Sequence, residues 1–537
     1  MDTQTNWFTW IMAVLPIAVL LITMIKFQWG ATQAAPLGLL VALITAMTVF
    51  KANINLIAVE SAKGIWSAFV VIIIIWPAIL LYEVANEAKA FVTFRRGMQK
   101  LLPNELLQVL ALGWVFVGFL IGITGFGVPV AVGAPLLVGV GVTPLFAVVI
   151  SLIGHAWGNT FGTLAVAWDA LTMSTNLGSN PELLLRTAMW AGIFIWIWNF
   201  IIGISICWFY GKGKAVKKGL PAVLVISLIQ GGGQLLLSQV NQTIACFLPA
   251  CVSLVAVLLI GKTRLYKKPW ALRDSKIMNR EYTGQADLEC HRDMTMLRAF
   301  VPYIALTVIT LFVLLIPPVK EFLGQWSFGF AFPQTATASG HINEAVAKYS
   351  PIAPLTHASL FLLLASLIGL WYFRKNKWID KAGTRAVFQR SVAKTVPSGF
   401  AVVGFIIMSR IMSGSGQTAV LAAGMAAVLG KGYAVLAPMV GMLGSFMTSS
   451  NMASNILFSE FQMATAGLLN FDTAVILGAQ TAGGAIGGAI CPGNIVLGTT
   501  TANILGQEGK ALKKILPLTV AAAILVGGVV FFTLVVI

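Results

Sequence analysis

The sequence predicts an all-α polytopic membrane protein with about 12 to 14 transmembrane segments, at roughly 20 residues for each crossing. The segments are expected to form two inverted-topology repeats, each with a re-entrant hairpin and a broken helix. Three observations predict this fold. The composition is too apolar for a water-soluble globule, long apolar runs alternate with short basic loops, and two segments interrupted by Gly and Pro match one another across the chain.

The composition excludes most other classes of protein. The 537 residues are 58% hydrophobic and only 10% charged, with a mean hydropathy of +0.88, whereas soluble domains carry about 25% charged residues. The net charge of +17 does not indicate nucleic-acid binding, because the basic residues cluster in short loops between apolar runs. Five scattered cysteines show no metal-ligand spacing, so no metal or cofactor is expected. The start MDTQTN lacks the basic region of a cleavable signal.

The apolar runs set the predicted crossings. Two interrupted segments lie between them, and the continuous runs lie near 7–25, 36–50, 66–86, 104–122, 187–210, 220–238, 243–260, 299–316, 355–373, 398–412, 417–448 and 515–537.

The loops between these runs predict the orientation. Residues 212–218 hold four lysines, 261–298 hold nine Lys/Arg against five acids, and 374–394 hold seven against one. The 317–354 segment holds two of each. Because basic loops stay in the cytoplasm, the first three segments are expected inside and 317–354 outside.

Two interrupted segments suggest an internal repeat. Shifted by 325 positions, residues 124–127 match 449–452, residues 152–158 match 477–483, and Gly162 matches Gly487. Walking outward from the basic loops, the end at Lys63 is external, while its counterpart at Lys394 is cytoplasmic. The two copies therefore run in opposite senses across the membrane.

The repeat predicts three parts of the chain. The first copy spans 1–212, the second spans 299–537, and residues 213–298 supply two linking helices and a basic cytoplasmic loop. In this architecture two broken elements meet near the middle of the membrane and form one site. Backbone that breaks at that depth needs protein or a water-filled cavity to satisfy its polar groups.

Candidate binding residues lie at the two predicted hairpin tips and the breaks beside them. Gly125 and Gly127 permit close approach of backbone, and an adjacent helix N-terminus offers unpaired N–H groups to an anion. The partner tip supplies neutral donors and acceptors. The alternative is that these side chains only cap helices and cement packing. The predicted substrate-binding residues are Thr124, Gly125, Gly127, His155, Asn159, Arg410, Ser449, Ser450, Asn451, Asn455, Gln480 and Asn494.

A few ionisable residues occur within or beside the apolar runs. Arg410 would cost about 2.5–3.5 kcal/mol at the centre of an inserted helix, so it should face protein, water or an anionic ligand. The alternative is an arginine near the helix end. His155, with an ordinary pKa of about 6.5, suits proton coupling, although a packing histidine is the alternative. Asp169 and Asp472 are further proton-coupling candidates.

The sequence around these residues resembles a known family. TGFGVPVAVGAPLLVGVG (124–141), LIGHAWGNTFG (152–162), GSFMTSSNMASNILFSEFQMATA (444–466) and GGAIGGAICPGNIVLGTTTANILGQEGK (483–510) are similar to the L-lactate permease family of bacterial 2-hydroxymonocarboxylate transporters. The resemblance implies proton-coupled uptake of lactate or glycolate and hairpins like those of the wider ion transporter superfamily. It departs at residues 488–494, where GAICPGN replaces the family's Asn-Met-Ile-Cys-x-His-Asn.

The leading hypothesis is a secondary transporter, a proton symporter as the resemblance implies, that imports a small organic anion such as L-lactate, glycolate or a related 2-hydroxymonocarboxylate. The alternative is a sodium-coupled carrier of another small organic anion, a dicarboxylate or sulfonate. An enzyme is not expected, since no HExxH or paired intramembrane aspartates occur. The expected location is the bacterial cytoplasmic membrane, and the oligomeric state is open, a homodimer included.

Overall fold

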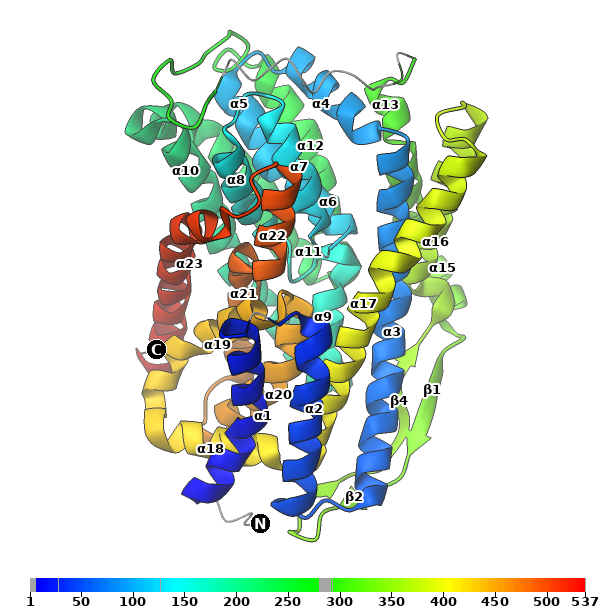
Figure 1. Ribbon diagram of the computed structural model, residues 1–537, viewed down its shortest axis with the longest axis vertical. Coiled ribbons are helices and arrows are strands. Elements are labelled where there is room, and N and C mark those ends of the chain that lie inside the picture. Colours follow the sequence, from blue (N-terminus) through cyan, green and yellow to red (C-terminus); the bar gives the residue numbers. More distant parts are fainter. Residues whose placement is uncertain (1–5, 28, 126, 280–290, 292, 537) are drawn as a thin grey trace.

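The computed structural model describes residues 6–27, 29–125, 127–279, 291 and 293–536. Within this part of the chain, nearly all of the structure is helical, and most helices run along the long axis of the molecule (Figure 1). The predicted helical membrane fold is therefore confirmed. Polar residues before the helices explain several starts: Asn53, Asn180, Asp380 and Ser450 each accept a backbone N–H of the following first turn.

Nine helices of the described chain are long and apolar enough to cross a membrane, or ten if one bent pair counts as a span. The number predicted from the sequence is larger for two reasons. It includes the shorter apolar helices Trp7–Leu20 and Thr32–Thr48. It also divides Pro181–Ser238, which is 58 residues long, into two crossings.

The first half of the chain begins with three helices and then passes through the first interrupted segment. The elements are α1 (Trp7–Ile25), α2 (Ala31–Thr48), α3 (Ile54–Glu87), α4 (Ala90–Leu101), α5 (Glu105–Leu110), the π-helix η1 (Ala111–Phe116), α6 (Val117–Ile123), α7 (Val128–Val138), α8 (Pro144–Ala156), α9 (Gly162–Thr175) and the 3₁₀ turn η2 (Leu177–Ser179).

The middle of the chain forms a helical hairpin. Helix α10 (Pro181–Ser227) has non-helical backbone angles at Gly211 and Lys212. Its arms run side by side in opposite directions, because Gly203 faces Val223 and Gly192 faces Leu235. The remaining elements are η3 (Leu228–Gly232), α11 (Gly233–Ser238), η4 (Gln242–Ile244) and α12 (Phe247–Lys262). Part of the predicted loop at 261–298 lies outside the described residues.

The second half repeats this pattern of long helices followed by an interrupted segment. Its helices are α13 (Met296–Ala299), α14 (Val301–Leu315), α15 (Pro317–Gly324), η6 (Pro354–Thr356), α16 (Ala358–Lys375), α17 (Lys381–Gly414), α18 (Gln417–Leu429), η7 (Gly430–Gly432), α19 (Tyr433–Thr448), α20 (Asn451–Leu468), α21 (Thr473–Gly487), η8 (Gly488–Ile490), α22 (Pro492–Thr501), α23 (Glu508–Phe531) and η9 (Phe532–Val536).

The segment between α15 and α16 adds a feature that the all-α prediction lacks. Strand β1 (Phe328–Phe332) pairs antiparallel with β4 (Val346–Ile352), and β2 (Thr335–Ala336) pairs with β3 (Ile342–Asn343). Tyr349 lies opposite Phe330 in the register of the first pair. These short sheets lie along α3 at the lower end of the molecule in Figure 1.

Helices α3 and α17 form the antiparallel pair at the centre of the fold. Gly64 lies against Ile407, and Gly399 lies against Ile72. Ion pairs join the helices near both ends, Glu60 with Arg410 at one end and Glu83 with Arg390 and Lys394 at the other. Residues 60 and 83 lie about 35 Å apart along a helix that rises 1.5 Å per residue, close to the ~30 Å hydrocarbon core of a bilayer.

The packing of the two halves is reciprocal. Helix α2 packs on α17, while α16 packs on α3. In the interrupted segments α9 packs on α20, while α22 packs on α7. This exchange of equivalent neighbours is what an inverted repeat requires. The inverted repeat and its boundaries, 1–212 and 299–537, stay predictions.

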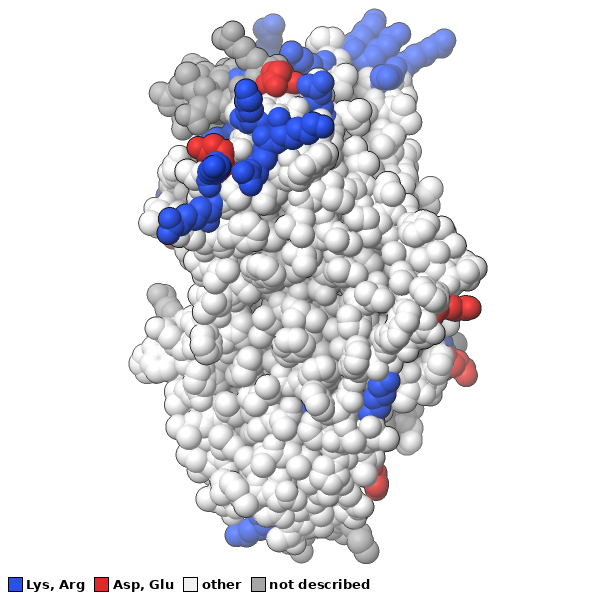
Figure 2. Space-filling model, turned by 90° about the vertical axis from the view of Figure 1, so that its right-hand side faces the viewer, with Lys and Arg blue, Asp and Glu red and all other residues white. Residues whose placement is uncertain are grey.

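The basic loops gather at one end of the molecule. Lys218 donates to the carbonyl of Leu265, Gly211 lies against Leu272, and Trp378 donates to Asp293. Figure 2 shows Lys and Arg side chains concentrated over the upper end of one face, and the middle of that face is almost free of charge. The residues between α15 and α16, 325–357, contain the four strands and are called the β segment. This segment lies toward the opposite end (Figure 1). The positive-inside rule predicts that the upper end is cytoplasmic.

This orientation can be tested with single cysteines at two exposed positions, Ala345 and Lys217. In intact cells we expect an impermeant maleimide to label Ala345→Cys, in the β segment, and to leave Lys217→Cys unlabelled until the membrane is opened. The parent protein with its native cysteines is the background control. The reverse pattern would contradict the assigned orientation.

Candidate functional site

A cavity of about 60 Å³ lies where the two interrupted segments meet. This volume exceeds the roughly 10–15 Å³ that one water molecule needs, so the cavity has room for several waters or a small ligand. Both halves of the chain line it. The predicted site residues among the lining are Gly125, Gly127, His155, Asn159, Ser449, Ser450, Asn451 and Asn494.

Helix ends converge on this cavity. Helices α7, α9, α20 and α22 begin at or directly after its lining residues, which include Gly127, Gly162, Ser450 and Cys491. Each helix N-terminus contributes about half a positive charge. Some of the first N–H groups are already bonded: the amide of Val128 donates to the carbonyl of Gly125, and the amide of Gly493 donates to Oγ of Ser449. No lysine or arginine occurs among the described lining residues. The positive charge that the described wall can offer comes from helix termini, and from His155 when it is protonated.

Hydrogen bonds connect the two broken segments across the cavity wall. Nδ2 of Asn451 donates to Oγ1 of Thr160 at 3.2 Å, and Oγ1 of Thr160 donates to the carbonyl of Thr481 at 3.1 Å. Nδ2 of Asn159 donates to the carbonyl of Ala485 at 3.2 Å. These bonds join the two segments through polar side chains and carbonyls of α21, of which Ala485 lies in the last turn and Thr481 inside the helix. The predicted meeting of the two segments is confirmed.

Two glycines allow this close approach. A methyl group at Gly488 would lie 2.0 Å from Nδ2 of Asn159, so any larger residue would displace that side chain. Gly127 has φ of +79° and precedes α7, and a side chain there would also contact Asn494. The left-handed conformation and the crowding both favour glycine at position 127.

Three residues beside the cavity adopt a left-handed backbone conformation that their residue types do not predict. Thr163, Leu164 and Ala165 all have positive φ, between 51° and 72°. For residues other than glycine, left-handed backbone costs roughly 1–2 kcal/mol each. Thr163 lines the cavity, and the main chain is held by bonds such as that from the amide of Trp168 to the carbonyl of Thr160, 3.1 Å long. Surrounding contacts thus maintain a strained break where α9 begins.

His155 lies in the cavity wall, and one of its ring nitrogens is hydrogen-bonded to the backbone. Its Nδ1 lies 3.0 Å from the carbonyl oxygen of Ser151, which can only accept a hydrogen bond. Nδ1 therefore carries a proton, and Nε2 is the nitrogen that can gain or lose one.

Three predicted site residues lie near the cavity but do not line it. Asn455 donates through Nδ2 to the carbonyl of Ala167 at 2.8 Å, and Ala167 is part of the wall. Thr124 ends α6 and donates to the carbonyl of Leu120. Gln480 is buried between Gln462 and Ser454.

The two predicted proton-coupling aspartates lie elsewhere. Asp472 caps the start of α21 and forms an ion pair with Arg186 of α10. Asp169 is half-buried on α9, and it is not among the residues that line the cavity. The structure brings neither carboxylate to the cavity wall.

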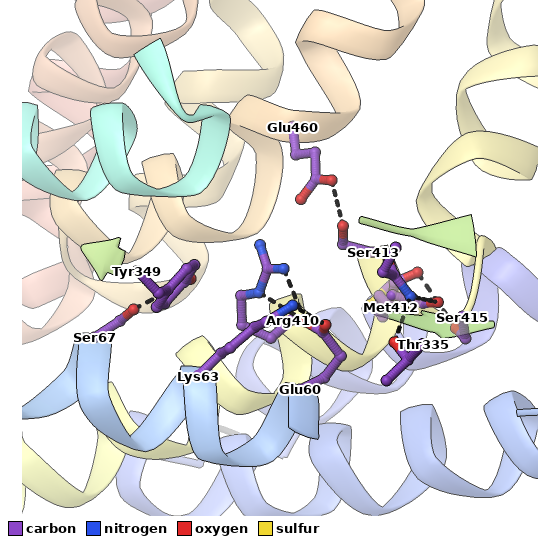
Figure 3. Close-up of polar contacts among 12 residues, drawn as sticks. Glu60, Lys63, Ser67, Thr335, Tyr349, Arg410, Met412, Ser413, Ser415 and Glu460 are labelled. Carbon is purple, nitrogen blue, oxygen red and sulfur yellow. Dashed lines mark hydrogen bonds and ion pairs between the residues drawn. The ribbon is translucent and has the colours of Figure 1, made fainter. Parts of the chain in front are cut away.

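Arg410 also lies away from this cavity. Its Nε and Nη2 donate to Oε2 of Glu60 at 3.0 and 2.8 Å, and the ring of Tyr349 lies 5.7 Å from the guanidinium carbon (Figure 3). Lys63 pairs with the other oxygen of Glu60 at 2.7 Å. The sequence prediction placed Arg410 between the hairpin tips, whereas the structure places it in this charged cluster.

Comparison with known proteins identifies the family. The family model described as L-lactate permease matches residues 9–537. The chain belongs to the L-lactate permease family. It is therefore a transporter and not an enzyme, and its multiple apolar helices and bacterial relatives indicate a multi-pass protein of the bacterial cytoplasmic membrane.

The similar proteins are distant in sequence but match at full length. The L-lactate permease of Escherichia coli strain K12 is 26% identical over 528 residues, 94% of this chain and 91% of that protein. The L-lactate permease of Halalkalibacterium halodurans is 24% identical over 93% and 92% of the two chains. The glycolate permease GlcA of Escherichia coli K12 is 25% identical over 94% and 91%.

Among solved structures, the YdaH transporter of Alcanivorax borkumensis aligns with 85% of this chain and 84% of its own, at 12% identity and a TM-score of 0.41. This likeness is too distant to carry a conclusion.

The contact between Gly488 and Asn159 yields a prediction about the cavity. We expect Gly488→Ala to displace Asn159, break its bond to Ala485 and reduce transport strongly, because a methyl group has no space there. Gly467→Ala is the matched control, since a Cβ at Gly467 meets no atom within 4 Å. Uptake per molecule in the membrane is the measurement. Equal activity of the two variants would show that the Asn159 contact is not part of the working site.

Proposed function

We propose that this protein is a secondary carrier that imports a small 2-hydroxymonocarboxylate, such as L-lactate or glycolate, together with a proton. The observation that supports it is the small polar cavity surrounded by four helix N-termini. Such termini stabilise an anion without a fixed countercharge. A site without a lysine or arginine also releases its ligand readily once the coupled proton has left, which a carrier needs on the far side of the membrane. The names of the relatives, lactate and glycolate permeases, support the same class of substrate.

The lining suggests how the substrate's two functional groups are bound. The carboxylate is placed at the start of α20, beside Ser450, with the positive end of α7 at Gly127 on the same wall. Side chains of Ser449, Asn451 and Asn494 supply neutral donors and acceptors for the 2-hydroxyl group. A dicarboxylate would bring a second charge into a cavity of about 60 Å³ that holds no cationic side chain, and burying an unpaired charge is costly.

His155 is the proposed proton carrier. With Nδ1 bonded to Ser151, protonation at Nε2 converts an acceptor into a charged donor that can pair with the substrate carboxylate. Anion and proton then stabilise each other in the same cavity, and each binds better in the presence of the other. The sodium-coupled alternative has no support in the named relatives.

Purified protein in liposomes tests the substrate and the coupling ion together. We expect counterflow of labelled lactate or glycolate, and accumulation when the outside is made acidic with no sodium present. Succinate and a short alkyl sulfonate should compete poorly. Accumulation driven by a sodium gradient at equal pH, without response to a pH gradient, would contradict the proposal.

Coupling through His155 has its own test. We expect His155→Gln to abolish accumulation driven by a pH gradient and to leave lactate exchange measurable, because exchange requires no net change of protonation. His357→Gln is the matched control, since His357 caps α16 and bonds to Ser359 away from the cavity. If His155→Gln still concentrates substrate under a pH gradient, His155 is only a packing residue.

A further inference from the structure

A second, smaller cavity lies beyond the first one along the same two helices. Residues of α9 line both, with Val166 and Ala167 at the first cavity and Ala170 and Ser174 at the second. On α20, Asn451 lines the first cavity and Ile456 the second. The two cavities are thus about 7–8 Å apart along α20, at 1.5 Å per residue.

Both helices lead away from the first cavity toward the end that carries the β segment. Helix α9 ends before the loop that enters α10. The second cavity is also lined by Tyr349 of β4, Ser67 of α3 and Arg410 of α17. The hydroxyl of Tyr349 lies 3.4 Å from Oγ of Ser67. Nε1 of Trp66 donates to the carbonyl of Tyr349 and holds the strand on α3.

Among the described residues, one charged side chain, Arg410, lines this second cavity. Two cations, Lys63 and Arg410, share the single carboxylate of Glu60, which is fully buried. The other nearby carboxylate, Glu460, accepts a hydrogen bond from Ser413 and forms no ion pair within the described part of the chain (Figure 3).

One nitrogen of Arg410 is uncommitted. Nε and Nη2 both donate to Oε2 of Glu60, and Nη1 donates to no atom of the described residues. Figure 3 shows that one nitrogen of the guanidinium is directed away from Glu60. A carboxylate could therefore bind Arg410 at Nη1 while the bond to Glu60 persists, and no buried charge would be left unpaired.

We propose that the seam between α9 and α20 is the route by which the anion passes between the outside and the first cavity. Arg410 binds the carboxylate in transit, and Tyr349 closes the mouth of the route. The second cavity measures about 10 Å³, no more than one water molecule needs, so the route is closed in this structure and opens when Tyr349 moves. This inference rests on the proposed carboxylate transport and assigns a second, external subsite to it.

Access to the seam is tested by a cysteine at Ser174. We expect an impermeant, negatively charged methanethiosulfonate applied outside to label Ser174→Cys, and external lactate to slow the labelling. Thr172→Cys on the same helix, which does not line the cavity, should be labelled slowly and without protection. The parent protein with its native cysteines gives the background.

Uptake kinetics test the role of Arg410. An ammonium cannot bind Glu60 and the passing carboxylate in the same fork-like geometry, so Arg410→Lys should raise the external half-saturation concentration by about tenfold or more, the scale of one charged hydrogen bond. Tyr349→Phe keeps the ring and loses only the hydroxyl contact with Ser67. It should therefore keep the route closed at rest and raise the half-saturation concentration less than Arg410→Lys. Arg390→Lys is the matched control, because Arg390 bridges the same two helices at their other end, and it should leave this concentration unchanged.

These results separate the two proposals. The route would be overturned if the wild-type protein transports lactate while Ser174→Cys stays unlabelled and Arg410→Lys has an unchanged half-saturation concentration. The proposed function would then remain intact. Equal increases for Arg410→Lys and Arg390→Lys would likewise overturn the route, since both ion pairs would then act only on the packing of α3 and α17. A wild-type protein without carboxylate uptake would overturn the proposed function itself.

Discussion

The constraint on which this structure depends is the need to satisfy broken backbone inside a membrane. Each interrupted segment ends one helix and begins another, which frees N–H and C=O groups that lipid cannot bond. Hydrogen bonds from Asn159 and Thr160 to α21, and from Asn451 to Thr160, join the two segments. Neither half could form this arrangement alone. The same breaks place helix N-termini around a cavity. The helix breaks therefore make the two halves depend on one another and also supply the partial positive charge that can bind an anion.

The long antiparallel pair α3 and α17 has a different role. Its ion pairs lie near the two ends and its middle is close-packed through glycine, as expected of helices that pair in lipid by close contact of small residues. At the Glu83 end, Arg390 and Lys394 are partly exposed, whereas Glu60 and Lys63 at the other end are buried, and each has an opposite charge as its partner. The cluster of Glu60, Lys63 and Arg410 lies close to the β segment, so its charge is available where a solute from outside would arrive.

Much of the site could be predicted from the sequence because its signals are local. Gly125, Gly127, Ser449 and Asn451 stand in interrupted apolar segments, and such segments indicate helix breaks by composition alone. The left-handed run from Thr163 to Ala165 carried no such signal, since threonine, leucine and alanine ordinarily avoid that backbone. The position of Arg410 depends on Glu60, 350 residues away in sequence. No local pattern reveals such a pairing. Asp472 directly precedes α21 and caps it, which is a local feature of the sequence. Its ion-pair partner Arg186 lies 286 residues away, so that pairing could not be predicted.

The central claim is that helix N-termini, with no lysine or arginine side chain, bind a small carboxylate at the cavity between the two halves. Thermal unfolding of the purified protein with lactate or with lactamide tests it most directly, because the amide keeps the hydroxyl group and the size but has no charge. At a hundred times its dissociation constant, lactate should stabilise the folded protein by about 2.7 kcal/mol. Lactamide should give no stabilisation, and the lactate effect should be lost in Gly488→Ala. Equal stabilisation by lactamide, or an unchanged lactate effect in Gly488→Ala, would contradict the account.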